Sequence, residues 1–393
     1  MTAIRVLGWV LIATPIVLFL YAYLLYPALL KLYLKVRPGT PLPAAPLEDP
    51  PTISITIPAY NEERSIGSTI ERLLALPYPP EKRQILIVSD ASTDRTDEIV
   101  RSYSDRGVEL LRMPSRTGKT AAENAAAKFL RGDIVVNMDA TIHLLPDSIP
   151  NLVRVFADPT IGVASGRDRS VSTVDRDAVK AESGYVGYEM WLRDLETACG
   201  TIVGASGCFY AIRRPLVQEL FPGALSRDFA SPLIARENGY RSVSVPDAYC
   251  LVPRARSLES EFNRKVRTMA RGLDTLFYKR HLLGFRRFGR FAFMLWSHKL
   301  ARWLVFLLLP GLPVGLGFLT ATGSEWARLA LALFLTGTAL GLLGWRWPGK
   351  GGTPRFLALP AFIVASCVAG VIAWGKLIRH EENPIWEPTR RAA

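Results

Sequence analysis

Charged and polar side chains follow several short apolar runs of the sequence, at places where a strand would end. Asp139 and Thr141 follow "DIVVNM", and Asp90 follows "QILIVS". Lys119 follows Gly118 directly before "TAAENAAAKFL", a stretch of helical character. Carboxylate oxygens are ligands for hard divalent cations, and a lysine at the start of a helix suits phosphate. These residues predict a metal or phosphate site, provided that the fold brings the strand ends together.

The segments around these residues alternate between two periodicities. Short runs rich in Ile, Val and Leu have the length of strands, and the stretches between them place apolar residues at helical spacing. The alternation predicts an α/β domain with a doubly wound, mostly parallel sheet, in which ligands bind beyond the carboxyl ends of the strands. The expected strands cover 53–58, 84–89, 108–113 and 133–138, and the expected helices cover 65–76, 97–104 and 120–130.

The composition limits the class of protein. The chain has 393 residues, of which 49% are hydrophobic, and a formal net charge of +13. A basic chain suits nucleic acid or anionic lipid, and the long apolar segments of this chain favour lipid. We therefore expect membrane lipids as partners and no nucleic acid. The four cysteines are scattered without C-x-x-C spacing, so neither a zinc site nor a disulfide framework is expected.

Both ends of the chain carry apolar segments long enough to cross a membrane. Residues 1–37 form the first span, and a Pro-rich linker follows at 38–51. A cleaved signal peptide is the competing interpretation, but the apolar core is too long and no A-x-A-like site follows it. An expected C-terminal membrane region at 297–380 contains three apolar segments near 300–320, 327–343 and 356–375, and a tail follows at 381–393.

The distribution of Lys and Arg predicts the orientation, because these residues favour cytosolic loops. The loop at 320–326 has neither and is expected outside, whereas the loop at 345–355 contains Arg346, Lys350 and Arg355 and is expected inside. The domain between the first span and the later ones is then cytosolic. A final segment that crossed the membrane would place the basic residues Lys376, Arg379, Arg390 and Arg391 outside. Either this segment is re-entrant or the rule fails there, and the sequence leaves both open.

Several motifs in order resemble the family 2 glycosyltransferases, which have the nucleotide-binding fold called GT-A. The motifs are "ITIPAYNEE", "VSDASTDRT", "RTGKTAAEN", "VNMDATIHLLPDS", "GASGCFYAIRR" and "SRDFASPLIARENGYRSVSVPDA", within a catalytic domain expected at 52–256. The chain is similar to bacterial transferases of exopolysaccharide and lipid-linked sugars. The resemblance implies an inverting enzyme of the cell membrane that moves a sugar from a nucleotide sugar to a lipid-linked or polysaccharide acceptor at the cytosolic face.

The resemblance also implies residue roles at the donor site. Asp90 would accept a ring N–H of the base, and a pyrimidine N–H favours a UDP-sugar. Asp139 matches the first aspartate of the family's D-x-D motif, and Thr141 stands in place of the second. These two residues would hold a divalent cation, Mn²⁺ or Mg²⁺, and we interpret His143 as a loop residue rather than a ligand. The nucleotide-sugar-binding residues would be Pro58, Tyr60, Asn61, Glu62, Asp90, Lys119 and Asp139.

The same resemblance assigns the acceptor side. Asp228 matches the catalytic base of the family, although Arg227 stands where the family usually has an acid. A helix cap is the alternative role for Asp228, just as Asn61 has the composition of a cap for the helix that follows it. Gly204 and Gly207 would allow a tight loop beside the acceptor.

A basic amphipathic segment, 257–296, follows the catalytic domain. Apolar residues at helical spacing form one face, and Arg264, Arg267 and Arg271 lie on the other. This pattern predicts an interfacial helix whose arginines face lipid headgroups; alternatively, the arginines cover the diphosphate. The family's processive synthases have a Q-x-x-R-W motif in this region, and "RKVRTM" has neither Gln nor Trp. A processive synthase that translocates its product and a non-catalytic nucleotide-sugar-binding protein remain the alternatives.

Overall fold

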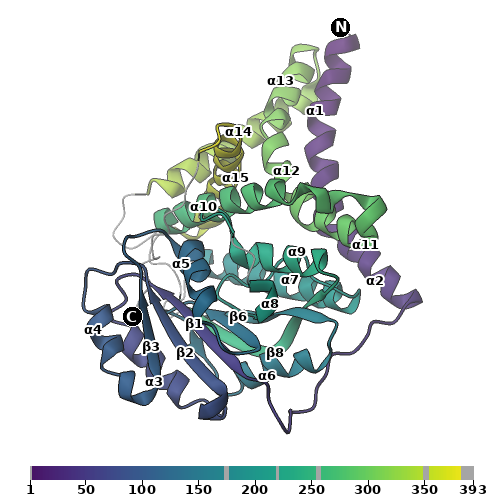
Figure 1. Ribbon diagram of the computed structural model, residues 1–393. Helices are drawn as coiled ribbons and strands as arrows, with labels where there is room; N and C mark the ends of the chain where they lie inside the picture. Colours follow the sequence, from purple (N-terminus) through teal and green to yellow (C-terminus); the bar gives the residue numbers. More distant parts are fainter. Residues whose placement is uncertain (1, 172–176, 218–220, 254–257, 348–353, 382–393) are drawn as a thin grey trace.

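The computed structural model describes residues 2–171, 177–217, 221–253, 258–347 and 354–381. An α/β domain forms one end of the molecule, and apolar helices project from it at the other (Figure 1). Lys350 and nearly all of the expected tail, including Arg390 and Arg391, lie outside the described residues.

One sheet organises the α/β domain, in the order β3-β2-β1-β4-β7-β6-β8-β5 among the described residues. The pairs β1–β2, β2–β3, β1–β4 and β6–β8 are parallel, whereas β7 is antiparallel to both β4 and β6. The predicted mostly parallel α/β fold is therefore confirmed. The strands are β1 (Ile53–Ala59), β2 (Arg83–Ser89), β3 (Val108–Arg112), β4 (Ile134–Met138), β5 (His143–Leu144), β6 (Ile161–Val171), β7 (Phe209–Arg213) and β8 (Arg241–Pro253).

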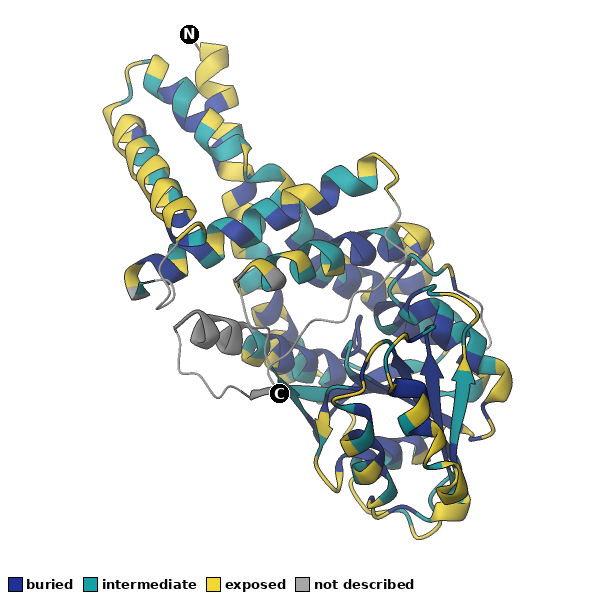
Figure 2. Ribbon diagram, turned by 90° about the vertical axis from the view of Figure 1, so that its left-hand side faces the viewer, coloured by how far each residue is buried: buried dark blue, intermediate teal, exposed yellow. Residues whose placement is uncertain are grey.

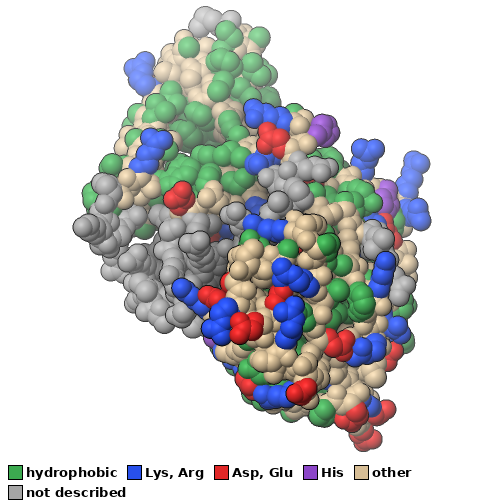
Figure 3. All heavy atoms as spheres, turned by 60° about the vertical axis from the view of Figure 1, so that its left-hand side comes forward, with side chains coloured by type: hydrophobic (Ala, Val, Ile, Leu, Met, Phe, Trp, Pro, Cys, Tyr) green, Lys and Arg blue, Asp and Glu red, His purple; other side chains and the backbone are tan. Residues whose placement is uncertain are grey.

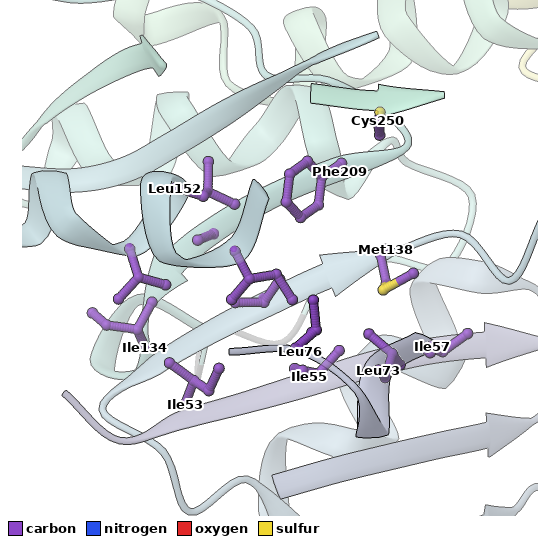
Figure 4. Close-up of a cluster of buried hydrophobic side chains, with 14 of the residues drawn as sticks. Ile53, Ile55, Ile57, Leu73, Leu76, Ile134, Met138, Leu152, Phe209 and Cys250 are labelled. Atoms are coloured by element: carbon purple, nitrogen blue, oxygen red, sulfur yellow. The ribbon is translucent and has the colours of Figure 1, made fainter. Parts of the chain in front are cut away.

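Helices cover both faces of this sheet, so its central strands are buried along their whole length. One cluster of buried side chains joins Ile53, Ile55 and Ile57 of β1 to Leu73 of α3 and Leu152 of α6 (Figure 4). A second cluster joins the other face to α5 and α9. The helices of this domain are α3 (Ile66–Leu74), α4 (Thr96–Arg101), α5 (Lys119–Ala126), α6 (Ser148–Arg154), α7 (Asp177–Ala198), α8 (Arg214–Val217) and α9 (Arg227–Glu237).

The apolar helices leave many large hydrophobic side chains exposed (Figures 2 and 3). Four of them are long and apolar enough to cross a membrane, by length and composition, among the described residues: Thr2–Val36, Phe285–Leu308, Glu325–Trp345 and Phe356–Ile378. The helices of these regions are α1 (Thr2–Leu20), α2 (Tyr26–Val36), α10 (Leu258–Tyr278), α11 (Phe285–Leu295), α12 (Ala301–Leu308), α13 (Gly311–Ala321), α14 (Glu325–Trp345) and α15 (Arg355–Ile378).

The bounds predicted for one apolar segment are wrong. Residues 300–320 were expected to form a single stretch, but α12 ends at Leu308 and α13 begins at Gly311. Pro310 lies at this break, where proline cannot supply a backbone N–H to continue the helix. A long helical segment instead runs from Phe285, across a kink at Gly289 where φ is 48°, through a π-helical turn to Leu308, so apolar structure begins before the predicted boundary at 297.

A buried ionic network joins the α/β domain to these helices. Glu189 of α7 contacts His298 Nε2 at 2.8 Å through Oε1 and Arg302 Nη1 at 2.9 Å through Oε2. Glu196, also on α7, contacts His298 Nδ1 at 2.7 Å and accepts a hydrogen bond from the Tyr26 hydroxyl at 2.7 Å. All five side chains are buried, so the network fixes α2 and the 285–308 helix on α7.

Candidate active site

A cavity of about 240 Å³ lies where the ends of β4 and β7 meet α5, α9 and α10. Six predicted site residues line this cavity: Lys119, Asp139, Gly207, Asp228, Arg264 and Arg267. The predicted site residues that follow β1 and β2 do not line it. Its lining residues include both acidic and basic side chains: Lys119, Glu123, Asp139, Asp168, Arg227, Asp228, Arg264, Arg267 and Arg271, together with Thr120, Gly207, Cys208, Ser226 and Thr268.

Lys119 provides a fixed positive charge at the bottom of this cavity. Its Nζ lies 2.6 Å from Asp139 Oδ1 and donates a hydrogen bond to the Gly207 carbonyl at 2.8 Å. Burial opposes the charged form, but the carboxylates of Asp139, Glu123 and Asp228 raise the pKa of Lys119 above its usual value. The ammonium group therefore stays charged and can attract an anionic ligand.

Asp90 positions the loop that carries Lys119. Its Oδ1 accepts a hydrogen bond from the Thr117 backbone N–H at 2.8 Å, and its Oδ2 accepts one from the Gly118 N–H at 2.8 Å. Gly118 has a φ of 93°, which glycine adopts readily, and it is the N-cap residue directly before α5. Each carboxylate oxygen has further acceptor capacity, so the contacts leave room for a ligand N–H.

Asn61 does not cap the next helix, so the cap interpretation is wrong. The helix α3 begins at Ile66 with Ser65 at its N-cap position. Asn61 has a φ of 54°, and its Oδ1 accepts the Thr93 backbone N–H at 2.8 Å. The side chain therefore ties the loop after β1 to the loop after β2, because both loops leave the same edge of the sheet.

The other residues predicted after β1 have different environments. Pro58 lies within β1 and is buried, where it pairs with Val88 of β2. The ring of Tyr60 lies under the Arg116 guanidinium, 3.9 Å from the ring centroid. Glu62 is buried and accepts the Ser65 hydroxyl at 2.6 Å. Tyr60 and Arg116 thus offer a stacking surface, whereas Pro58 and Glu62 shape the backbone around it.

Asp228 lies in the first turn of α9, and its side chain does not form the helix cap. Ser226 is the N-cap residue, and its hydroxyl donates to Asp228 Oδ1 at 2.7 Å. A Cβ on Gly207 would lie 2.9 Å from Asp228 Oδ2, so only glycine permits this approach without a shift. Arg227 donates hydrogen bonds to Asn124 and to the Val217 carbonyl, so its guanidinium is bound away from Asp228.

The arginines of α10 line the cavity, a position that suits the alternative in which they cover the diphosphate better than the one in which they face lipid headgroups. Arg264 and Arg267 line the cavity beside the acidic residues. Arg271 is 7% exposed and donates to Thr120 Oγ1 at 2.9 Å and to the Gly223 carbonyl at 3.1 Å. The apolar stripe of α10 packs on other helices, with Leu273 fully buried. The amphipathic pattern was identified correctly, but its polar face meets a protein cavity.

Two further carboxyl groups line the cavity and were missed from the sequence. Glu123 is 4% exposed, and its Oε1 has no hydrogen-bond partner among the described residues. Burial raises the pKa of Glu123 above its usual value, although Lys119 and Arg227 oppose the shift. Its position four residues after Lys119 on one helical face could have identified it. Asp168 accepts the Ser206 hydroxyl at 2.5 Å, and no local pattern signals it.

Thr141, His143 and Gly204 also lie outside the cavity lining. His143 is exposed and belongs to β5, where it pairs with Leu251, rather than to a loop. A Cβ on Gly204 would lie 3.1 Å from Lys299 Cε and 3.4 Å from Phe229 Cδ2, so Gly204 lies on the side of the 285–308 helix. Gly207, in contrast, borders the cavity directly.

The donor set fits a divalent cation only partly. No group of three His, Cys, Asp or Glu residues is arranged around a metal position in the part of the chain that the structure describes. Asp139 supplies one carboxylate, which already contacts Lys119, and Asp168 borders the same cavity. These oxygen donors suit a hard cation whose remaining ligands are phosphate oxygens and water.

Comparison with known proteins identifies the domain that carries this cavity. Residues 54–221 match the family described as Glycosyl transferase family 2. The chain contains a glycosyl transferase family 2 domain. The match runs from β1 to β7 and includes α5. The helices α9 and α10, which also line the cavity, lie after the matched residues.

Curated relatives of the family 2 domain include enzymes of lipid and lipid-linked sugars. An undecaprenyl-phosphate 4-deoxy-4-formamido-L-arabinose transferase of Edwardsiella ictaluri is 26% identical over 200 residues, which cover 49% of this chain and 58% of that protein. A beta-monoglucosyldiacylglycerol synthase of Synechocystis is 33% identical over 121 residues, covering 30% of this chain and 25% of that one. The chain thus spans well under two thirds of the length of these relatives.

A solved structure resembles the chain over nearly its whole length. The mannosyltransferase PcManGT of Pyrobaculum calidifontis, in complex with GDP-Man and Mn²⁺, has a TM-score of 0.72 and 24% identity. The alignment covers 96% of this chain and 100% of that one. The likeness confirms a GT-A fold for the family 2 domain with its attached helices.

Proposed function

We propose that this protein is an inverting glycosyltransferase that uses a nucleotide sugar and a lipid-linked or glycan acceptor. The observation that carries this proposal is the single cavity of the family 2 domain that contains both Lys119 beside Asp139 and the carboxylate of Asp228. The exposed apolar helices support a multi-pass location in the cell membrane, and the positions of Lys and Arg support a cytosolic catalytic domain. Release of free nucleotide from donor plus membrane lipid extract tests the activity.

In this proposal, Asp228 removes the proton from the acceptor hydroxyl. The acceptor oxygen then attacks the anomeric carbon from the face opposite the departing diphosphate, so the configuration inverts. Ser226 and Gly207 hold the Asp228 carboxylate in place. The nucleoside diphosphate leaves with both electrons of the broken bond, and Lys119, Arg264 and Arg267 offset the charge that develops on it.

Asp139 and Thr141 would hold a divalent cation, Mn²⁺ or Mg²⁺, together with the diphosphate oxygens. Such an ion supplies Lewis-acid stabilisation of the leaving group when bound. Lys119 contacts Asp139 at 2.6 Å, so the ammonium competes with the ion for that oxygen and reduces the dependence on metal.

Substitution at the D-x-D positions tests the metal proposal. Thr141→Asp should increase the stimulation by Mn²⁺, because it adds a second anionic oxygen ligand. Asp139→Asn should weaken Mn²⁺-dependent binding of UDP, measured by calorimetry with and without the ion. His143→Asn is the matched control, since His143 is exposed on β5, paired with Leu251, and should leave the metal response unchanged. Unaltered Mn²⁺-dependent binding in Asp139→Asn would remove this residue from the ligand set.

The donor is proposed to be a UDP-sugar. Asp90 is 5% exposed and anchored by two backbone N–H groups, so it can present acceptor oxygens to the ring N–H of uracil. UDP should raise the melting temperature more than GDP at equal concentration. Asp90→Asn should abolish this preference, and Asp105→Asn, at an exposed position of the same domain, should preserve it. Stabilisation by GDP alone would make a guanosine donor the better assignment, as in the mannosyltransferase structure.

The α10 arginines give a third test of the cavity. Arg264→Gln with Arg267→Gln should reduce transfer about 100-fold or more, both in anionic liposomes and in neutral detergent, because removal of a charge at the leaving group acts in any medium. Arg286→Gln with Arg287→Gln is the control, since both arginines are exposed on α11. The control pair should lose activity only where anionic lipid is present. If the variant with both Arg264→Gln and Arg267→Gln keeps full activity in detergent, these arginines act at the membrane surface instead.

Two alternative functions have separate signatures. A processive synthase would yield long polymer from a single acceptor, whereas the proposed enzyme adds one sugar. A non-catalytic nucleotide-sugar-binding protein would bind donor without releasing free nucleotide. The cavity favours catalysis over binding alone, because Asp228 borders it without an ion pair to Arg227.

A further inference from the structure

The last helix of the described residues, α15, has the composition of a membrane span. Phe356–Ile378 is 23 residues long with a mean hydropathy of 2.4, the highest among the candidate spans. A crossing would separate Arg346, before the helix, from Lys376 and Arg379 at its end, and would place one group outside. The contacts of α15 instead indicate a helix that does not cross the membrane.

The helix α15 runs beside α10 in the same direction. Near one end, Lys265 Nζ contacts Ser366 Oγ at 2.8 Å and lies 3.5 Å from the Phe362 ring centroid. Near the other end, the rings of Phe277 and Trp374 are 6.0 Å apart between centroids. The Lys265–Phe362 and Phe277–Trp374 pairs are 12 residues apart on both helices, so the two helices lie side by side for about 18 Å at 1.5 Å per residue. Figure 1 shows α15 beside α10, below α13.

The position of α10 determines how deep this pair of helices lies relative to the membrane. Arg264, Arg267 and Arg271 of α10 line the polar cavity of the family 2 domain, so α10 cannot lie within the hydrocarbon of a membrane. A helix that packs alongside α10 for three turns lies at the same depth relative to the membrane. The end of α15 also returns to the domain, because Trp374 packs in one cluster with Phe229 of α9 and Leu192 of α7.

Several large apolar side chains of α15 are exposed. At about 100° per residue, five of them fall within about 120° around the helix and form one stripe: Phe356, Leu359, Ile363, Val371 and Ile378. The stripe continues the exposed apolar surface of α14, against whose end α15 packs closely: a Cβ on Gly344 would lie 2.7 Å from the Leu357 carbonyl oxygen. Lipid acyl chains are the occupant that fits a surface of this extent and composition beside apolar helices.

We propose that α15 lies along the membrane surface without crossing it, with this stripe in lipid and both ends on the side of the family 2 domain. Arg346, Lys376 and Arg379 then share one side, as the distribution of Lys and Arg demands. The inference rests on helix contacts alone and does not depend on the proposed transferase activity.

Single cysteines in the full-length chain test this path. The four natural cysteines are replaced by serine, and one cysteine is introduced at a time at exposed positions: Ser102→Cys in the family 2 domain, Glu325→Cys at the start of α14, Arg346→Cys after α14 and Arg379→Cys after α15. A membrane-impermeant maleimide is added to intact cells and, separately, to permeabilised cells. Melting curves confirm that each variant is folded.

Arg379→Cys should react like Ser102→Cys and Arg346→Cys, whereas Glu325→Cys should show the opposite accessibility. A reaction of Arg379→Cys that matches Glu325→Cys instead would show that α15 crosses the membrane and would overturn the proposal. If the serine background does not fold, a fluorescent protein fused to the C terminus of the natural chain gives the same comparison. Protection of that fusion from external protease, together with protection of the family 2 domain, supports the proposal, and its digestion alone overturns it.

Discussion

Replacement of Asp228 by asparagine should reduce the rate of sugar transfer by about 100- to 10,000-fold, the contribution of a positioned general base. Asparagine keeps the size of the side chain and can still accept the Ser226 hydroxyl hydrogen bond that Asp228 receives at 2.7 Å. It cannot take the proton of an acceptor hydroxyl. Binding of the nucleotide should stay near that of the unmodified protein, so the loss should appear in turnover and not in the dissociation constant of UDP.

Glu123→Gln is the matched comparison for this experiment, because Glu123 is a second carboxyl group in the same cavity. Burial raises its pKa and favours the neutral form, which is a poor base. If Asp228→Asn keeps most of its rate while Glu123→Gln loses it, Glu123 is the base. If Asp228→Asn loses nucleotide binding together with turnover, Asp228 belongs to the donor site.

The second large effect concerns stability. Glu189→Gln should reduce the free energy of unfolding by about 3–5 kcal/mol, because removing one partner of a buried ion pair leaves charge uncompensated. Glu189 is 8% exposed and contacts both His298 and Arg302. The loss should be measured by chemical denaturation in detergent, with the transition of the α/β domain followed separately.

Glu325→Gln provides the control for this measurement. Glu325 pairs with Arg328 at 3.0 Å, but both side chains are exposed, at 77% and 60%. Exposed pairs contribute about 0–1 kcal/mol, so this variant should unfold almost like the natural chain. If both variants lose the same free energy of unfolding, the buried network contributes no more to stability than the exposed pair does.

The order of elements around the site could be predicted because it depends on local signals. Apolar runs mark strands, and the polar residue after each run marks the edge where ligands bind, so Asp90, Lys119 and Asp139 were placed near one another from spacing alone. The break at Pro310 was a local signal too, but the hydropathy of the flanking residues hid it.

The position of α10 at the cavity could not be predicted in the same way. An amphipathic helix shows which of its faces is polar, but not whether that face meets headgroups, water or an acidic cavity. For Arg264 and Arg267 the answer depends on α10 folding back over α5, which is far away in sequence, and over α9. Asp168 was missed for a related reason: its position in the cavity follows from the pairing of β6 with β8, which no neighbouring residue signals.

The ionic network also sets an order of events during biosynthesis. Glu196 lies 170 residues after Tyr26 and 102 residues before His298, so α7 leaves the ribosome well before the 285–308 helix exists. At about 5–20 residues per second, this interval lasts roughly 5–20 s. During that time Glu189 and Glu196 must stay in water, because neither His298 nor Arg302 has yet been synthesised. The final packing of α7 therefore waits for the later helices, and a domain excised before residue 285 would keep that face of α7 open to solvent.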